Sequence, residues 1–180
     1  QAGDVSAYIP TNVISITDGQ IFLENELFFE GQRPAVNIGL SVSRVGGAAQ
    51  TKAVKKAVGS LRLDLAQYRE MEVFMQFASD LDDATKKQLY YGQGLMRLLR
   101  QPQYRPYTQT QEVLLLVCAL GRKMQGVPVE EINAFADRML EYISTVRPDI
   151  CDSIGKGELT PETKEAILAA ADKFRASEGK

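Results

Sequence analysis

The sequence predicts a mixed, mainly α fold, in which edge strands of an incomplete α/β domain precede a C-terminal helical bundle. Before Gly46-Gly47, short β-branched runs alternate with turn signals. After Gly47, apolar residues recur at spacings of three and four almost to the end. The apolar content of 44% and the charged content of 24% are typical of a soluble globular protein. We therefore predict two parts, residues 1–46 and residues 47–180.

The first part contains a strong signal for a β-hairpin. Val13–Thr17 and Gln20–Leu23 flank Asp18-Gly19, a dipeptide that suits the positive φ angles of a tight turn. A third strand is predicted over Ala35–Ser43. Because two or three uncovered strands are marginally stable, they indicate the edge of a larger sheet. We expect these strand edges to pair with a second copy of the chain or to rearrange, while the bundle folds normally.

The second part begins with a long helical pattern. Apolar residues from Val54 to Met75 predict one long amphipathic helix or two helices joined near Gly59. A further helix is predicted to begin at a cap formed by Asp80 or Asp82, and its apolar positions are Leu89, Met96 and Leu99.

Proline and capping signals mark the later helices. Pro102 and Pro106 predict a loop, and Thr108-Gln109-Thr110-Gln111 is a capping box for a very apolar helix that ends before Gly126. Thr160-Pro161 predicts the start of the last helix, with proline at its first position. A further apolar stripe comprises Val129, Ile132, Phe135, Met139, Ile143 and Val146.

Composition excludes several classes of function. The chain has no histidine, which excludes histidine general bases and nearly all transition-metal sites. A net charge of −2 without charge blocks argues against nucleic acid or an anionic membrane as a partner. Cys118 lies in the apolar run 114–120, which predicts a buried thiol and is too short to span a bilayer. No signal segment is recognisable at Gln1, and the chain reads as beginning inside a longer protein.

The most informative stretch runs from Arg33 to Gly47. It predicts a strand that ends at Arg44, followed by two glycines and a helical pattern. An arginine at such a corner is always charged and can bind phosphate oxygens in pairs. The residues alone also allow a second interpretation, in which Arg44 forms an interface or surface ion pair.

Four segments in order resemble the alpha subunit of F-type ATP synthases: Ala7–Gln20, Arg33–Gln50, Leu65–Glu70 and Gln101–Tyr104. The chain lacks the phosphate-loop pattern GxxxxGK[ST], so the resemblance implies a C-terminal fragment. Residues 1–46 would be the end of the nucleotide-binding domain, and residues 47–180 the C-terminal helical domain. The Ser41–Gly47 segment argues against a beta-type or vacuolar-type relative.

The resemblance implies roles for three residues near the catalytic site. Arg44 matches an arginine finger that acts in trans on the phosphates held by the neighbouring beta subunit. Ser15 matches a serine near the same phosphate, and Ser41 matches a signature serine required for activity. The residues alone favour a strand serine facing a polar neighbour for Ser15. For Ser41 and Ser43, hydrogen bonds that fix the strand end remain an equal alternative.

The resemblance also implies a pocket for the non-catalytic nucleotide. Gln101 and Gln103 match glutamines beside the adenine, whose edge suits an amide donor and acceptor. Phe28, Arg33 and Pro34 match residues that wall the same pocket. The alternatives are solvated glutamines in a proline-bounded loop and a core phenylalanine.

For the parent complex, the resemblance implies a rotary ATP synthase that transports protons, or sodium ions, and uses ATP or ADP with Mg. Expected partners are the beta subunit, the central-stalk gamma subunit and other head subunits. The location would be peripheral, on the cytoplasmic face of a bacterial membrane or the matrix or stromal face of an organelle, without direct insertion. We expect the fragment alone to be inactive, with no tightly bound nucleotide and no metal site. The alternative is a free-standing helical protein-interaction domain without an enzymatic role.

Overall fold

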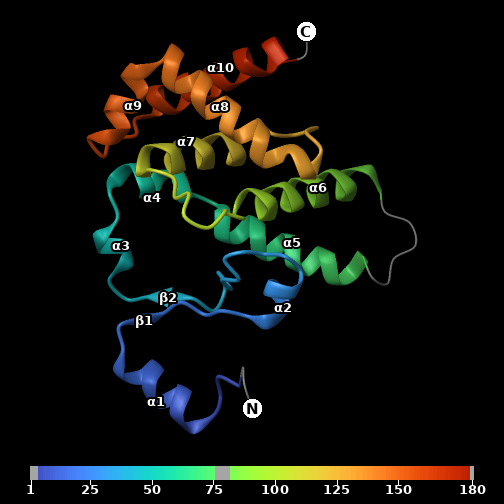
Figure 1. Cartoon of the computed structure of the whole chain (residues 1–180), viewed down its shortest axis with the longest axis vertical. Helices are drawn as coiled ribbons and strands as arrows, with labels where there is room; N and C mark the ends of the chain where they lie inside the picture. The colour runs from blue at the N-terminus through green and yellow to red at the C-terminus, as the bar shows by residue number, and fades with distance from the viewer. Residues whose placement is uncertain (1–3, 76–81, 179–180) are drawn as a thin grey trace.

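The structure is a computed structural model that describes residues 4–75 and 82–178 (Figure 1). It confirms the predicted fold class, because a small antiparallel sheet with short helices precedes a helical bundle. The first part contains α1 (Tyr8–Ile16), β1 (Gly19–Gln20), α2 (Asn25–Phe29), β2 (Val42–Ser43) and α3 (Gly46–Ala49). The bundle contains α4 (Lys52–Val58), α5 (Leu61–Met75), α6 (Asp83–Leu98), α7 (Gln109–Leu120), the 3-10 turn η1 (Val129–Glu131), α8 (Ile132–Val146), α9 (Pro148–Gly155) and α10 (Pro161–Glu178).

The sheet pairs β1 with β2 rather than with a preceding strand. Gly19 lies opposite Ser43 and Gln20 opposite Val42, and a bridge between Leu23 and Val36 extends the same antiparallel pairing. A Cβ atom on Gly19 would lie 2.3 Å from the carbonyl oxygen of Val42. Glycine at this position therefore permits the close approach of the two strands.

The prediction of a hairpin is wrong for its first strand, Val13–Thr17. Residues 13–16 belong to helix α1. Helical bonds run from the Thr11 N–H to the Ala7 carbonyl and from the Thr17 N–H to the Val13 carbonyl, both at 3.1 Å. Pro10 is compatible with this helix because the first N–H groups of a helix have no intrahelical acceptor. The segment therefore satisfies its backbone hydrogen bonds within α1, and β1 pairs instead with β2.

The predicted third strand is confirmed only at its two ends, Val36 and Val42–Ser43. Between them Asn37 forms a turn: its Oδ1 accepts the Leu40 N–H at 3.0 Å, and its carbonyl accepts the Ser41 N–H at 3.0 Å. An asparagine side chain that bonds to nearby backbone commonly replaces strand pairing with a turn.

The structure confirms several predicted helix boundaries in the bundle. Gly59, with φ +40°, separates α4 from α5. Asp82 caps α6 by accepting the Thr85 N–H, and Asp80 lies outside the described residues. Thr108 and Gln111 form the capping box of α7. Short helices α2, α3 and α9 were not predicted.

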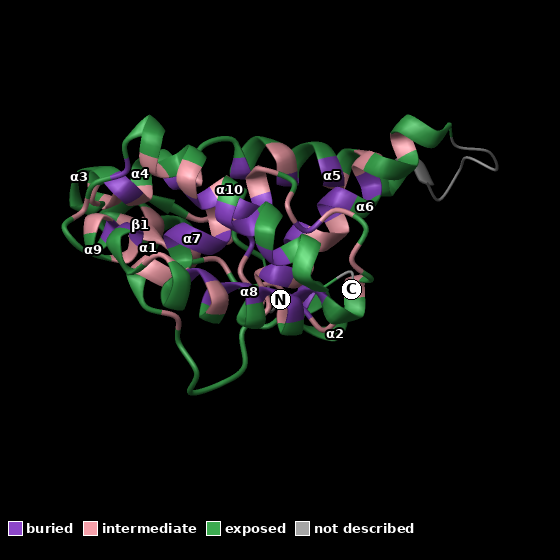
Figure 2. Ribbon diagram, turned by 90° about the horizontal axis from the view of Figure 1, so that it is seen from above, coloured by how far each residue is buried: buried purple, intermediate pink, exposed green. Residues whose placement is uncertain are grey.

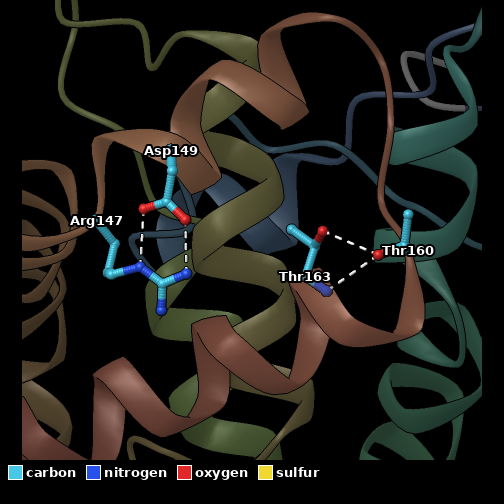
Figure 3. Close-up of polar contacts among 4 residues, drawn as sticks. All are labelled: Arg147, Asp149, Thr160 and Thr163. Atoms are coloured by element: carbon cyan, nitrogen blue, oxygen red, sulfur yellow. Dashed lines mark hydrogen bonds and ion pairs between the residues drawn. The ribbon is translucent and has the colours of Figure 1, made fainter.

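Polar contacts also define the ends of the last two helices (Figure 3). Arg147 Nε and Nη2 donate to the two carboxylate oxygens of Asp149 at 2.8 and 2.6 Å, beside the first turn of α9. Thr160 Oγ1 accepts the Thr163 N–H at 3.1 Å, which caps α10 ahead of Pro161 as predicted.

The core lies on α7 and the helices around it, where the buried residues gather (Figure 2). The largest fully buried side chains come from α7, α8, α9 and α10: Leu114, Met139, Ile143, Ile154 and Ile167. Cys118 is buried in this core as predicted, whereas Val146, at the end of the predicted apolar stripe, is exposed. The first part of the chain contributes few buried side chains.

The packing of α6 on α5 predicts that a side chain at position 92 lowers the stability of the fold. A Cβ atom there would lie 2.4 Å from Cγ of the buried Tyr68. We expect Gly92→Ala to lower the free energy of unfolding by about 1–3 kcal/mol, because the ring must move within a packed interface. Gly155→Ala is the matched control, since a Cβ atom at Gly155 would have no neighbour within 4 Å. Urea unfolding followed by circular dichroism measures both, and equal midpoints would contradict the close contact.

Burial of Cys118 predicts a pH-dependent difference between the two cysteines. Removal of the thiol from water raises its pKa from 9.0 to about 12. Below pH 9 the thiol is protonated in both the folded and unfolded states. Between these values the unfolded chain loses the proton and the folded chain retains it, so this group lowers stability as pH rises.

At pH 8 we therefore expect a thiol reagent to modify the half-buried Cys151 first and Cys118 only after unfolding in guanidinium. Mass spectrometry of the labelled peptides identifies the modified residue. Cys151→Ser should remove the labelling of the folded protein. Equal labelling rates for both cysteines would show that Cys118 is accessible.

Candidate functional site

Arg44 lies at the corner that the sequence predicts, between β2 and α3. Its backbone N–H donates to the Asp18 carbonyl at 2.8 Å, which ties the corner to the end of α1 and the start of β1. The side chain is exposed, and no carboxylate among the described residues lies within 4.0 Å of it. The backbone of Arg44 is therefore held at the corner, and its guanidinium is available to an anion outside the described chain.

Ser41 and Ser43 both bond to backbone at this corner. Ser41 Oγ donates to the Asn37 carbonyl at 2.6 Å and accepts the Phe22 N–H at 2.9 Å. Ser43 Oγ accepts the Gly46 N–H at 2.8 Å. This geometry matches the alternative in which the serines fix the strand end. A role of Ser41 in activity stays a prediction.

Ser15 lies on the exposed surface of α1, not on a strand. Its hydroxyl donates to the Asn12 carbonyl of the same helix at 2.7 Å. Within the described chain, no hydrogen bond joins the side chains of Ser15, Ser41 and Arg44. The Asp18–Arg44 backbone bond joins the corner to the segment that follows α1.

The structure brings Phe28, Arg33 and Gln101 of the second predicted set together, whereas no contact in the described residues joins Gln103 to them. We call Phe28, Arg33, Pro34, Gln101 and Gln103 the Phe28 patch. The Arg33 guanidinium carbon lies 4.5 Å from the centroid of the Phe28 ring, which is a cation–π distance. The Gln101 N–H donates to the Arg33 carbonyl at 2.9 Å, which brings the loop after α6 to the loop after α2.

The Phe28 patch is open to solvent. The Phe28 side chain is 47% exposed, which contradicts the alternative of a core phenylalanine, and its role as a pocket wall stays a prediction. Gln101 and Gln103 are exposed, and their amides make no side-chain hydrogen bond within the described residues. An accessible ring beside free amide donors and acceptors can stack on a planar heterocycle and bond to its edge.

Arg100 holds the two loops of the Phe28 patch together, and sequence reasoning missed it. Its Nε donates to Gln32 Oε1 at 3.1 Å, and its Nη2 donates to the Glu30 carbonyl at 3.4 Å. Gln32 is only 5% exposed, and its partner is 68 positions away. No local pattern signals a contact over this separation. On the other side, Asn133 Nδ2 of α8 donates to the Arg100 carbonyl at 3.1 Å.

The described residues contain no group of three or more histidine, cysteine, aspartate or glutamate side chains that could hold an ion. Separately, no helix among these residues is both long enough and apolar enough to cross a membrane.

The Arg100 contacts predict a local loss of order in the Phe28 patch. We expect Arg100→Met to leave the bundle folded and to speed hydrogen exchange of the Gln101 amide, because the bond to Arg33 loses its support. Arg100→Lys, which keeps the charge but cannot donate to both acceptors, should have an intermediate effect. Arg105→Met removes an exposed arginine in the same loop and is the control. Unchanged exchange in Arg100→Met would show that apolar contacts alone hold the loops.

Two protein-family comparisons divide the chain much as its structure does. Residues 50–174 match the family model of the ATP synthase alpha/beta chain, C terminal domain. Residues 1–43 match the ATP synthase alpha/beta family, nucleotide-binding domain. The first match covers the helical bundle and more than half of the chain, and the second covers the segment that contains α1, the sheet and most of the Phe28 patch. The chain therefore belongs to the ATP synthase alpha/beta family.

Proposed function

We propose that this chain is the C-terminal part of an alpha-type subunit of an F-type ATP synthase and supplies Arg44 in trans to a catalytic site on a neighbouring beta subunit. Membership of the family favours this function over a free-standing interaction domain. In the same proposal, the nucleotide-binding part ends at residue 46 and the helical domain begins at residue 47.

The observation that carries the proposal is the exposed Arg44 guanidinium, without a carboxylate within 4.0 Å in the described residues. An arginine finger must reach phosphate oxygens outside its own chain, and an internal ion pair would compete with them. Its positive charge stabilises the negative charge that develops during phosphoryl transfer, which accelerates hydrolysis by about 10³–10⁵-fold. Ser15 and Ser41 belong to this proposal as residues near the same phosphate, with Ser41 acting through the strand end that it fixes.

The Phe28 patch supports a second part of the proposal, a wall of the non-catalytic nucleotide site. The half-exposed ring and free glutamine amides fit an adenine base. ATP or ADP with Mg would bind in the parent complex, where other residues hold the phosphates. The described chain presents no such phosphate cradle, so we expect weak nucleotide binding by the fragment and no hydrolysis.

The partners in the proposal are the beta subunit, the gamma subunit of the central stalk and other head subunits. The first part exposes apolar side chains that a partner surface would cover, including Tyr8, Ile9, Ile16, Ile21 and Phe29. A second copy of the chain is the alternative partner that would cover these apolar side chains, and this self-association stays a prediction. We place the complex on the cytoplasmic face of a bacterial membrane, or on the matrix or stromal face of an organelle, as a peripheral assembly that carries out ATP synthesis and ion transport.

Replacement of Arg44 in the full-length parent subunit tests the catalytic role. After assembly with the beta subunit, we expect Arg44→Ala to lower steady-state ATP hydrolysis by a factor on the order of 10³ or more, with the head intact by gel filtration. Arg44→Lys should recover little activity, because lysine lacks the paired donors of a guanidinium. Lys52→Ala removes a nearby exposed cation and should leave turnover unchanged. Near-normal turnover in Arg44→Ala would make Arg44 an interface residue.

A further inference from the structure

A large open groove runs beside α6. Its volume is about 1260 Å³. Its walls are one face of α6, the segment that joins α7 to α8 with η1, and the end of α10. Figure 1 shows the connection from α7 to α8 lying next to α6. We call this cavity the α6 groove.

The α6 groove is basic in a chain whose net charge is −2. Among the described residues, five cationic side chains line it, and Glu130 is its only acidic residue. The cations are Lys87, Arg97, Arg100, Arg122 and Arg175. Within residues 4–75 and 82–178, no carboxylate lies within 4.0 Å of any of them. None of these cations therefore forms an ion pair within the described chain.

Neighbouring contacts hold several of these cations in place. The Arg122 guanidinium lies 4.4 Å from the centroid of the Tyr91 ring, and its Nη2 donates to Gln88 Oε1 at 3.1 Å. Arg175 Nη2 donates to the Gln125 carbonyl at 2.9 Å. Because these partners are neutral, the contacts orient the guanidinium groups without cancelling their charge.

A buried donor in the wall of the groove lacks a partner. Arg97, which lines the groove, has a buried Nε with no hydrogen-bond partner within the described structure. Buried donors and acceptors are nearly always satisfied in folded proteins. An occupant of the groove would provide Arg97 with a partner that the chain itself does not.

The size of the groove distinguishes between kinds of anionic occupant. Lys87, Tyr90, Gly94 and Arg97 recur at spacings of three and four and follow one face of α6 over about 15 Å. Pockets for small molecules usually have volumes of about 300–1,000 Å³, so this groove is larger and longer than a single small anion needs. Tyr90, which is 67% exposed, offers an aromatic surface between the cations.

We propose that the α6 groove binds an acidic, amphipathic peptide segment of a partner protein. Its carboxylates would pair with Lys87, Arg97 and Arg122, and its apolar side chains would pack on Tyr90 and Val129. This interaction is independent of the proposed catalytic role of Arg44, because the two sites share no residue. The negative charges and the apolar face of such a peptide complement the basic walls and the apolar floor of the groove.

A synthetic peptide tests the proposal with the 180-residue chain. The probe has about ten residues, enough to span about 15 Å as a helix, with glutamates on one face and leucines on the other. The control peptide carries lysine in place of each glutamate. Pyrophosphate and ATP are the small-anion probes. Amide shifts of Gly94 and Gly126, measured by NMR at low and high salt, report occupation of the groove.

We expect the acidic peptide to bind, with affinity that falls as salt rises. Lys87→Gln and Arg122→Gln should each weaken it about tenfold, or about 1.4 kcal/mol. Lys86→Gln is the matched control, because Lys86 is adjacent to Lys87 on α6 but does not line the groove. The Lys86 Nζ lies 3.9 Å from an Asp83 carboxylate oxygen. A melting curve for each variant confirms folding.

Four outcomes would overturn the proposal. The acidic peptide fails to shift the groove amides, the lysine peptide binds equally well, or Lys86→Gln weakens binding as much as Lys87→Gln. In the fourth, pyrophosphate or ATP occupies the groove and the acidic peptide does not, which would make it a small-anion site. None of these outcomes depends on assembly with a beta subunit, so they are separate from the test of Arg44.

Discussion

The contacts of Arg100 are the constraint on which the placement of the first part depends. Between residues 4 and 45 only Leu27, Gln32 and Asn37 are buried, so this segment has little hydrophobic core of its own. Polar contacts to the bundle therefore contribute more than apolar burial to holding this segment in place. A hydrogen bond to a charged group contributes about 1.5–3 kcal/mol, and the bond from Arg100 to the buried Gln32 belongs to this class. Arg62 Nη2 adds a second tie to the Ile38 carbonyl at 3.3 Å.

Two sets of cations in this chain have different physical roles. Lys123, Arg138 and Arg147 are paired with carboxylates at 2.6 Å, and these pairs connect helices or close a turn. Arg44 and the cations of the α6 groove have no such partner in the described residues. The first group is satisfied by the fold. Arg44 and the groove cations carry charge directed to solvent, which makes them the places where an anion from outside is favoured.

Local signals made the bundle predictable from sequence, because caps such as Asp82 and Thr108 act on backbone atoms a few residues away. The same logic failed for Val13–Thr17, because the segment that pairs with β1 lies more than 20 residues further on. The candidate site was predictable only in part. The residues of the Phe28 patch were named through a resemblance, and their contacts across the fold could not follow from periodicity or composition. Arg100 and Gln32 carried no signal, because a loop glutamine is usually solvated and only the fold buries this one.

Arg100 also connects two regions that otherwise look separate. Its side chain bonds to Gln32 and to the Glu30 carbonyl beneath the Phe28 patch, and it lines the α6 groove. Its carbonyl accepts a hydrogen bond from Asn133, whose own buried Oδ1 has no partner among the described residues. Its Nε and one donor of Nη2 are engaged by the loop after α2, so an anion in the groove would reach Arg100 through its remaining donors. The Phe28 patch and the α6 groove therefore share one side chain, and the buried Gln32, which would lose its charged partner, holds Arg100 on the side of the patch.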